Sequence, residues 1–528
     1  MSKSLAGWRA ALVLALGAWL GASAVAAEAG PRVRVAQGRI EGITHDGVDA
    51  FLGIPYARPP VGEQRWRAPE APAPWTGVRP ARAVGAACMQ DAPRPWGPFT
   101  TEFVDVQAPL SEDCLFLNVW TPHARGPRPL PVIVWIHGGG FGSGAASVPI
   151  YDGARLASRG AVVVGINYRL GIFGFLAHPE LSAESPLRVS GNYGLLDMIA
   201  ALRWVRANVS RFGGRSDQVT IAGQSAGAAA VLDLLAAPDA RGLFSAAIAM
   251  SGAGMGVGAL PLADAQAQGA ALVREAGIAS VSELRQLPAD KVLAIRPRVD
   301  MSAGMPRLLF APVVDGRVLP HDVEATGDRF ASAVPVISGY MADEGFVMGP
   351  PSATPASFEA HVRQRYGAAA ERFLAAYPHA DEAQATRSMR EIGRDRYMAS
   401  LVMWAQRRAH AGQAVYGYLY SRAIPGPDAQ RFGAFHTGEV PYLFGTLDER
   451  WRPYGEADRR VSAALQQQWL AFARGERLPS PWAPLQGDEP RVTELGEVPP
   501  TPVTAISDPS RLQVFLDYVA AGGRLSMF

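Results

Sequence analysis

The chain is 528 residues long, with 48% hydrophobic and 19% charged residues. This composition is typical of a globular protein and excludes a disordered or fibrous one. Its 50 basic and 48 acidic residues nearly balance, and no basic stripe is interleaved with aromatic residues, so the charge pattern gives no indication of a nucleic-acid partner.

The first residues have the pattern of a secretory signal peptide. Lys3 and Arg9 precede a long apolar run that ends in the small-residue sequence AVA, which is typical of cleavage after Ala26 or Ala27. A retained membrane anchor is the alternative, but the run is short for a span, and no later segment is apolar enough to cross a bilayer. We therefore expect residues 1–27 to be removed, and the remaining chain to be exported to the periplasm or the medium without membrane insertion.

The chain has two cysteines, Cys88 and Cys114. In an oxidising compartment, an even pair most simply forms one disulfide, which would stabilise the fold by about 3–4 kcal/mol through loop closure. Two free, buried thiols are the alternative. Neither cysteine lies in a cluster of histidines or other cysteines, so the sequence predicts no metal site.

Short apolar runs rich in β-branched residues alternate with stretches of helical spacing, such as 195–212. Runs without polar alternation indicate strands covered on both faces, as in a mostly parallel sheet flanked by helices. Because there is no internal repeat and no linker, we expect residues 28–528 to form one α/β domain with long insertions, its Pro-rich N-terminal third wrapping around the sheet. The predicted strands are 131–136, 161–167, 218–222, 246–251, 334–338 and 414–420.

A glycine-rich sequence, WIHGGGFGSG at residues 135–144, follows the first of these strands directly. Consecutive glycines let the backbone approach a substrate and turn its N–H groups inward, as in the oxyanion hole of hydrolases with this layout. The donors would be the amides of Gly139 and Gly140, together with the amide of Ala226. A flexible loop is one alternative; a phosphate-binding loop is another, but no Gly-Lys-Ser/Thr sequence follows.

The sequence GQSAG at residues 223–227 places Ser225 between a predicted strand and an Ala-rich helix, which is where a nucleophile elbow must lie. Glycine is needed on both sides because a side chain would collide with the strand and helix that cross there. The helix N-terminus directs N–H groups at developing negative charge. An ordinary Gly-rich turn is the alternative, so the interpretation depends on partners elsewhere in the chain.

A serine nucleophile needs a base and an orienting acid, and in this layout the chain order is serine, acid, histidine. Asp343 and Glu344 lie just past a strand end, and the pattern does not separate them. Of the five histidines after Ser225, four lie in helical or turn-like sequences. The fifth, His436, lies in an irregular stretch after strand 414–420, where loops carry catalytic groups, and is the candidate base.

The chain resembles the type-B carboxylesterase/cholinesterase family of the α/β-hydrolase superfamily over nearly its whole mature length. The resemblance implies the α/β-hydrolase fold, with Ser225 as nucleophile, Glu344 as acid and His436 as base, and so favours Glu344 over Asp343. The motifs that carry it are FLGIPYARPPVGEQRWRAPE (51–70), SEDCLFLNVWTP (111–122), HGGGFGSG (137–144), NYRLGIFGFL (167–176), GNYGLLDMIAALRWVRANVSRFGGRSDQVTIAGQSAGA (191–228), FAPVVDGRVLP (310–320), DEG (343–345) and FHTGEVPYLFG (435–445).

The same resemblance implies a Cys88–Cys114 disulfide and two structural ion pairs. The chain departs from the family pattern at Gln224, where many members have glutamate. Trp96 does not clearly match the family's cation-binding tryptophan, so choline specificity is not inferred. The implied ion pairs join Arg58 with Glu112 and Arg169 with Asp197.

The activity implied is hydrolysis of a carboxylic ester through an acyl-enzyme, without a metal or organic cofactor. An amidase or peptidase using the same triad is one alternative. A non-catalytic binding member of the fold is another, which the presence of all three triad residues disfavours. The expected partner is a small-molecule ester; the sizes of its acyl and alcohol groups and the oligomeric state of the protein stay open.

Overall fold

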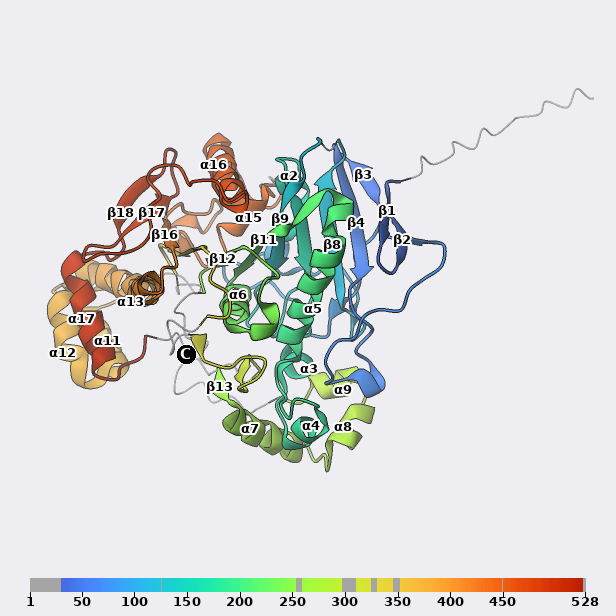
Figure 1. The fold of residues 1–528 in the computed structure, drawn as a ribbon. Helices are drawn as coiled ribbons and strands as arrows, with labels where there is room; N and C mark the ends of the chain where they lie inside the picture. Colours follow the sequence, from blue (N-terminus) through green and yellow to red (C-terminus); the bar gives the residue numbers. More distant parts are fainter. Residues whose placement is uncertain are drawn as a thin grey trace, which may run out of the picture.

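The computed structural model describes residues 30–124, 126–252, 259–296, 310–323, 330–344, 352–448 and 450–525. The predicted signal peptide, 1–27, lies outside these residues. Figure 1 shows a large twisted sheet with helices on both sides. Within the described ranges, none of the helices combines the length and the apolar character that a membrane span requires.

The centre of the fold is an 11-stranded sheet with the order β18-β17-β16-β15-β12-β11-β9-β10-β8-β4-β3. Its strands are β3 (Ile43–His45), β4 (Val48–Pro55), β8 (Phe116–Pro122), β9 (Leu130–Ile136), β10 (Val162–Ile166), β11 (Gly214–Gln224), β12 (Ala246–Met250), β15 (Val336–Met341), β16 (Val415–Tyr420), β17 (Arg491–Leu495) and β18 (Thr501–Thr504).

The strands from β17 to β10 pair in parallel, and all six predicted strands lie among them. The edges are antiparallel: β18 pairs with β17 at one end, and β8, β4 and β3 continue the sheet beyond β10 at the other. The expectation that the Pro-rich N-terminal third wraps around the sheet is incomplete, because this part of the chain also supplies the three strands β3, β4 and β8.

The parallel strands are apolar throughout because both of their faces are covered. In β9, Val132, Val134 and Ile136 belong to the core under α5 (Tyr193–Asn208) and α6 (Ala226–Ala236). The alternate residues, Ile133 and Trp135, belong to the core under α16 (Glu456–Ala473). Each buried side chain of this size contributes about 1.5–3 kcal/mol. Figure 1 shows α5 and α6 in front of the sheet, with α16 beyond its opposite face.

The predicted helical stretch 195–212 forms α5 and a following 3-10 turn, η3 (Val209–Phe212). This turn ends at Gly213, whose φ of 84° is in the left-handed region that glycine adopts without steric cost. The chain then continues into β11, the strand that ends directly before the candidate nucleophile Ser225.

The remaining helices lie mainly in two groups beyond the sheet, one of α11, α12, α13 and α17 and the other of α3, α4, α7, α8 and α9 (Figure 1). Their bounds, with those of the other elements, are α1 (Thr101–Val104), α2 (Ala154–Ala157), α3 (Gly171–Phe175), α4 (Pro179–Glu184), α7 (Leu262–Glu275), α8 (Val281–Gln286), α9 (Ala289–Leu293), α11 (Pro355–Tyr366), α12 (Ala370–Ala376), α13 (Glu382–His410), α14 (Ala429–Phe432), α15 (Val440–Phe444), α17 (Pro509–Ala520), the 3-10 turns η1 (Gly62–Gln64), η2 (Pro149–Tyr151), η4 (Pro238–Ala240) and η6 (Gly367–Ala369), and the minor strands β1 (Arg32–Val35), β2 (Gly38–Glu41), β5 (Val78–Pro80), β6 (Ala87–Cys88), β7 (Leu110–Ser111), β13 (Leu260–Pro261) and β14 (Val313–Val314).

Candidate active site

The candidate site lies at the carboxyl ends of neighbouring parallel strands, which is where open α/β sheets place their ligand sites. The glycine loop follows β9, Ser225 follows β11, Glu344 follows β15, and the segment after β16 leads to His436. Residues from distant parts of the chain therefore meet at one edge because their strands are neighbours in the sheet.

Ser225 occupies a strained turn between β11 and α6. Its φ of 58° and ψ of −126° are unusual for a residue other than glycine, and such strain costs on the order of 1–3 kcal/mol and gathers at functional sites. The flanking residues must be glycines because a side chain at either position would clash with the main chain. A Cβ on Gly227 would lie 2.1 Å from the carbonyl oxygen of Ile136, and one on Gly223 would lie 2.4 Å from that of Gly227. The turn therefore has the geometry expected of a nucleophile elbow.

The glycine loop lies directly beside this turn. A Cβ built on Gly138 would lie 3.1 Å from the Cβ of Ser225. Gly139 and Gly140 have φ of 108° and 61°, so the loop needs glycine at both positions. Among the described residues, the amides of Gly139, Gly140 and Ala226 donate to no other group. These three N–H groups are therefore available to an oxygen beside the serine.

His137 begins the glycine loop and fixes its orientation. Its Nδ1 donates to the carbonyl oxygen of Gly138 at 2.8 Å, and its ring stacks on Tyr168 with centroids 4.5 Å apart. The Tyr168 hydroxyl in turn donates to the His137 carbonyl oxygen at 2.9 Å. Burial lowers the pKa of His137 to about 4, so its imidazole is neutral at physiological pH.

Glu344 is buried and its two carboxylate oxygens are engaged by different partners. Oε2 accepts from the Ser251 hydroxyl at 2.8 Å and from the Met341 amide at 2.9 Å. Oε1 accepts from Nδ1 of His436. The two donors to Oε2 fix the plane of the carboxylate, which in turn fixes the tautomer of the imidazole. Ser251 follows β12 at the same sheet edge and was missed by sequence reasoning, although its place at a predicted strand end was a usable signal.

The adjacent Asp343 points elsewhere. Its Oδ2 accepts from the Ala434 amide at 2.8 Å, and its Oδ1 lies 3.7 Å from Nη1 of Arg390. It therefore anchors the segment that leads to His436.

The imidazole of His436 is hydrogen-bonded to Glu344 on one side and to Gln224 of the serine turn, rather than to Ser225 itself, on the other. Burial lowers its pKa, while the charge and the hydrogen bond of Glu344 raise it further, with an added rise once Glu439 ionises, so the pKa lies above the usual value. Its Nε2 lies 3.2 Å from Nε2 of Gln224. Ser225 Oγ forms no hydrogen bond to the imidazole within the described residues. The side chain of His436 is 15% exposed and Ser225 is half-buried, so both can be reached by a substrate.

Glu439 is a second buried carboxyl group near the imidazole. It is 1% exposed, and its Oε1 accepts from the Tyr418 hydroxyl at 3.4 Å. Burial, followed by the charge of Glu344, raises its pKa from 4.5 to about 8. Glu439 is therefore largely protonated at neutral pH. Sequence reasoning missed it, although it lies three residues after His436.

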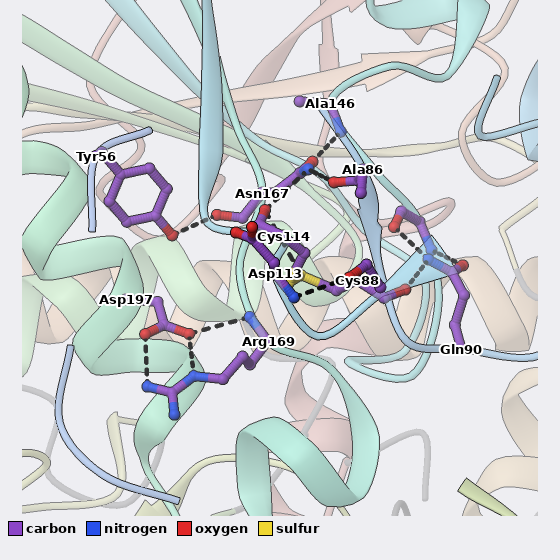
Figure 2. The surroundings of a disulfide bond; sticks show 12 residues. Tyr56, Ala86, Cys88, Gln90, Asp113, Cys114, Ala146, Asn167, Arg169 and Asp197 are labelled. Atoms are coloured by element: carbon purple, nitrogen blue, oxygen red, sulfur yellow. Dashed lines mark hydrogen bonds and ion pairs between the residues drawn. A yellow bond between two sulfur atoms is a disulfide. The ribbon is translucent and has the colours of Figure 1, made fainter. Parts of the chain in front are cut away.

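The predicted disulfide is present and lies close to the glycine loop. Cys88 and Cys114 are joined, with their Cα atoms 4.9 Å apart. Gln90 connects this region to the loop, since its Nε2 donates to the carbonyl oxygens of Cys88 at 3.0 Å and Gly144 at 2.9 Å, and its Oε1 accepts from the Gly144 amide at 2.8 Å. Figure 2 shows Gln90 on one side of the disulfide and Asn167 beside it.

Arg169 and Asp197 form the expected buried ion pair, with Nε and Nη2 donating to the two carboxylate oxygens at 2.8 and 2.7 Å (Figure 2). Burial lowers the pKa of Arg169, but the charge and hydrogen bonds of Asp197 raise it further, so it lies above the usual value. Both residues are fully enclosed, which makes the bidentate geometry necessary.

The predicted pair of Arg58 and Glu112 is wrong. Glu112 binds Arg65, whose Nε and Nη2 each donate at 2.6 Å. Nη1 of Arg65 also donates to main-chain carbonyls at the end of α8, so the buried guanidinium is satisfied on every side. Arg58 instead pairs with Glu70 at 3.1 Å, where both side chains are more than half exposed. Both arginines lie in the same motif, and the resemblance selected the exposed one.

Histidine, cysteine and carboxylate side chains do not gather in groups of three or more suited to hold a metal ion anywhere in the described part of the chain.

A strained serine turn, a glycine loop with available amides and a Glu–His pair at one sheet edge define a serine hydrolase with the α/β-hydrolase fold. A solved structure titled PNB esterase superposes with a TM-score of 0.76 at 32% sequence identity, covering 92% of this chain and 99% of that one.

The sequence profile of the Carboxylesterase family matches residues 29–506, and the chain belongs to this family. It is 37% identical over 451 residues to a fumonisin B1 esterase of Sphingopyxis macrogoltabida, covering 83% of this chain and 80% of the relative. It is 36% identical over 452 residues to a para-nitrobenzyl esterase of Bacillus subtilis (strain 168), covering 83% and 88%. The chain is accordingly a carboxylic ester hydrolase.

Proposed function

We propose that Ser225, Glu344 and His436 are the catalytic triad and hydrolyse carboxylic esters through an acyl-enzyme. The observation that carries the assignment is the Glu344–His436 pair at the sheet edge where the strained Ser225 turn faces the glycine loop. The complete triad requires the Ser225 hydroxyl to donate to Nε2 of His436.

In this mechanism His436 accepts the proton of Ser225 as the oxygen attacks the ester carbonyl. The resulting oxyanion binds the amides of Gly139, Gly140 and Ala226, each worth about 2.7–4 kcal/mol of transition-state stabilisation. His436 then protonates the leaving alcohol and later activates the water that releases the acid. Glu344 holds the imidazole in the correct tautomer and stabilises the imidazolium.

We propose that the substrate is a small-molecule ester with an apolar group. The surroundings of the proposed base are apolar, because Phe435 precedes His436 and packs against Phe99 and Phe103 at 5.8 and 5.7 Å between centroids, all three rings being buried. Trp96, 52% exposed, packs on Phe99 at 4.8 Å. The relatives are named for the esters fumonisin B1 and para-nitrobenzyl compounds. A chain-length series of p-nitrophenyl esters, run beside a bulky-alcohol ester, defines the preferred size.

The assignment of the nucleophile is tested with a fluorophosphonate probe, which labels an activated serine. We expect the probe to label one serine in the wild type. In Ser225→Ala, labelling should disappear and ester turnover should fall by several orders of magnitude. The exposed Ser210→Ala variant is the matched control and should keep both. Wild-type turnover in Ser225→Ala would refute the proposal. Turnover of an amide with the same acyl group as the ester separates an esterase from an amidase.

We further propose that residues 28–528 form the exported catalytic domain and that residues 1–27 are a signal peptide. The disulfide supports an oxidising compartment. N-terminal sequencing of the protein recovered from periplasm or medium should begin at Ala27 or Glu28, whereas an intact N-terminus in the membrane fraction would contradict export by cleavage.

A further inference from the structure

The side chain of Gln224 lies between the catalytic base and the residue that follows it. Gln224 is the last residue of β11 and is 1% exposed. Its Oε1 accepts from the Thr437 hydroxyl at 3.0 Å, and its Nε2 lies 3.2 Å from Nε2 of His436. Both ends of the buried amide are therefore engaged, and both contacts lead to the loop that carries the base.

These contacts determine which atom of the amide faces the imidazole. The carboxylate of Glu344 can only accept, so Nδ1 of His436 carries the proton, and Nε2 of the neutral ring is an acceptor. Its partner must then be a donor, which the amide nitrogen of Gln224 is. The Thr437 hydroxyl, on the opposite side, donates to the amide oxygen at 3.0 Å in this orientation and anchors that end of the side chain.

Thr437 is held in place at a cost. Its φ of 76° is in the left-handed region, which a β-branched residue rarely adopts. Strain of this kind costs on the order of 1–3 kcal/mol and persists where the surroundings demand it. The backbone of Thr437 also accepts from the Val440 amide at 3.1 Å. This conformation directs the hydroxyl at Gln224 from the position next to His436.

We infer that Gln224 and Thr437 form a positioning pair, in which the amide of Gln224 donates to Nε2 of His436 and holds the imidazole neutral in the resting enzyme. The inference rests on the proposed function of His436 as the base. The pair opposes the carboxyl groups around the ring, which favour the imidazolium. Among the residues that the structure describes, the titratable or charged groups that face the ring or its direct neighbours are Glu344, Glu439, Tyr418, Asp343 and Arg390.

The identity of residue 224 therefore sets the pH at which the base becomes neutral. A glutamate at this position accepts hydrogen bonds only, so it would stabilise the imidazolium. An amide oriented by Thr437 does the reverse. The same hydrogen bond occupies the lone pair that must accept the proton of Ser225, so it is exchanged for the serine hydroxyl when the substrate is attacked.

The experiment measures the pH dependence of kcat/KM for p-nitrophenyl acetate in four variants. Gln224→Met keeps the length of the side chain and removes its hydrogen bonds, and Gln224→Glu replaces the donor by an acceptor. Thr437→Val removes the hydroxyl that orients the amide, whereas Thr437→Ser keeps it. Activity rises with pH as His436 loses its proton, so the midpoint of the acid limb of the profile gives the pKa of His436.

We expect the acid-side midpoint to move to higher pH by about 0.5–1 unit in Gln224→Met, the size expected for loss of one neutral hydrogen bond. The shift should be larger in Gln224→Glu and of the same sign in Thr437→Val. Thr437→Ser should keep the wild-type midpoint. A role limited to packing would lower activity at every pH and leave the midpoints unchanged.

Two outcomes overturn the inference: midpoints of Gln224→Met and Gln224→Glu that coincide with the wild type, or equal shifts in Thr437→Val and Thr437→Ser. The rate of fluorophosphonate labelling, measured at each pH, keeps the test independent of substrate binding and shows that each variant is folded. If Ser225 is not labelled in the wild type, the proposed function itself fails. If Ser225 is labelled and the midpoints coincide, only the role of the pair fails.

Discussion

Replacing Glu439 by glutamine should change the pH dependence of stability. Glu439 lies at the start of α15, is 1% exposed and has a pKa raised from 4.5 to about 8, chiefly by burial and then by Glu344. Its carboxyl group ionises near 4.5 in the unfolded chain but keeps its proton to about 8 in the folded one. Between these values the unfolded state binds fewer protons, so the free energy of unfolding falls as pH rises.

The magnitude follows from the size of the window. Each pKa unit corresponds to about 1.4 kcal/mol, so the pKa difference at Glu439 removes about 3–4 kcal/mol of wild-type stability between pH 5 and pH 8. Glutamine has nearly the same shape and does not ionise. The free energy of unfolding of Glu439→Gln, relative to the wild type, should therefore increase by about this amount over the same interval.

Equilibrium urea unfolding, followed by tryptophan fluorescence at pH 5, 6, 7 and 8, measures this difference. Taking the difference between variant and wild type cancels the other titrating groups, which both proteins share. Glu476→Gln, at an exposed site, is the matched control and should show no trend with pH. A Glu439→Gln difference that is the same at all four pH values would refute the assignment of a protonated carboxyl group at this site.

Ser251→Ala should lower kcat/KM about tenfold or more at unchanged fold, because Glu344 loses a hydroxyl donor to its carboxylate; steady-state kinetics with far-UV circular dichroism check this. Arg65→Leu should destabilise the protein by about 3–5 kcal/mol because it leaves the largely enclosed Glu112 unpaired, whereas Arg58→Leu should cost less than about 1 kcal/mol. Equal urea midpoints for the two variants would contradict the pairing. Reduction of the disulfide should lower the free energy of unfolding by about 3–4 kcal/mol, measured by urea unfolding with and without dithiothreitol.

The centre of the sheet could be predicted from sequence because burial on both faces leaves an unbroken apolar run, as in β9 and β10. The edge strands could not be predicted in this way, because they are not buried on both faces and so have no unbroken apolar run. In β3, all three residues are exposed, and their strand conformation depends on pairing with β4. The same reasoning explains the arginine error. Whether Arg58 or Arg65 meets Glu112 depends on carbonyls supplied by α8, more than 200 residues away, to which local sequence carries no signal.

The candidate triad residues could be named because each follows a strand and matches a motif, but their supporting residues are visible only in three dimensions. Gln224 was noted as a departure from the family pattern, with no partner assigned. Its contacts with Thr437 and His436 span more than 200 residues. Ser251 and Glu439 likewise act on groups supplied by other strands or loops, so the second layer of the site depends on the register of the sheet.

The charges of this second layer give a physical reason for an amide at position 224. The carboxylate of Glu344 accepts from two donors, and burial keeps Glu439 protonated up to about pH 8, so Glu344 is the carboxylate that faces the imidazole near neutral pH. A carboxylate at position 224 would add like charge to an enclosed site, and it would raise either its own pKa or that of the imidazole. With an amide there, the resting base is neutral over a wider range of pH, and the imidazolium is favoured when the proton of the nucleophile arrives.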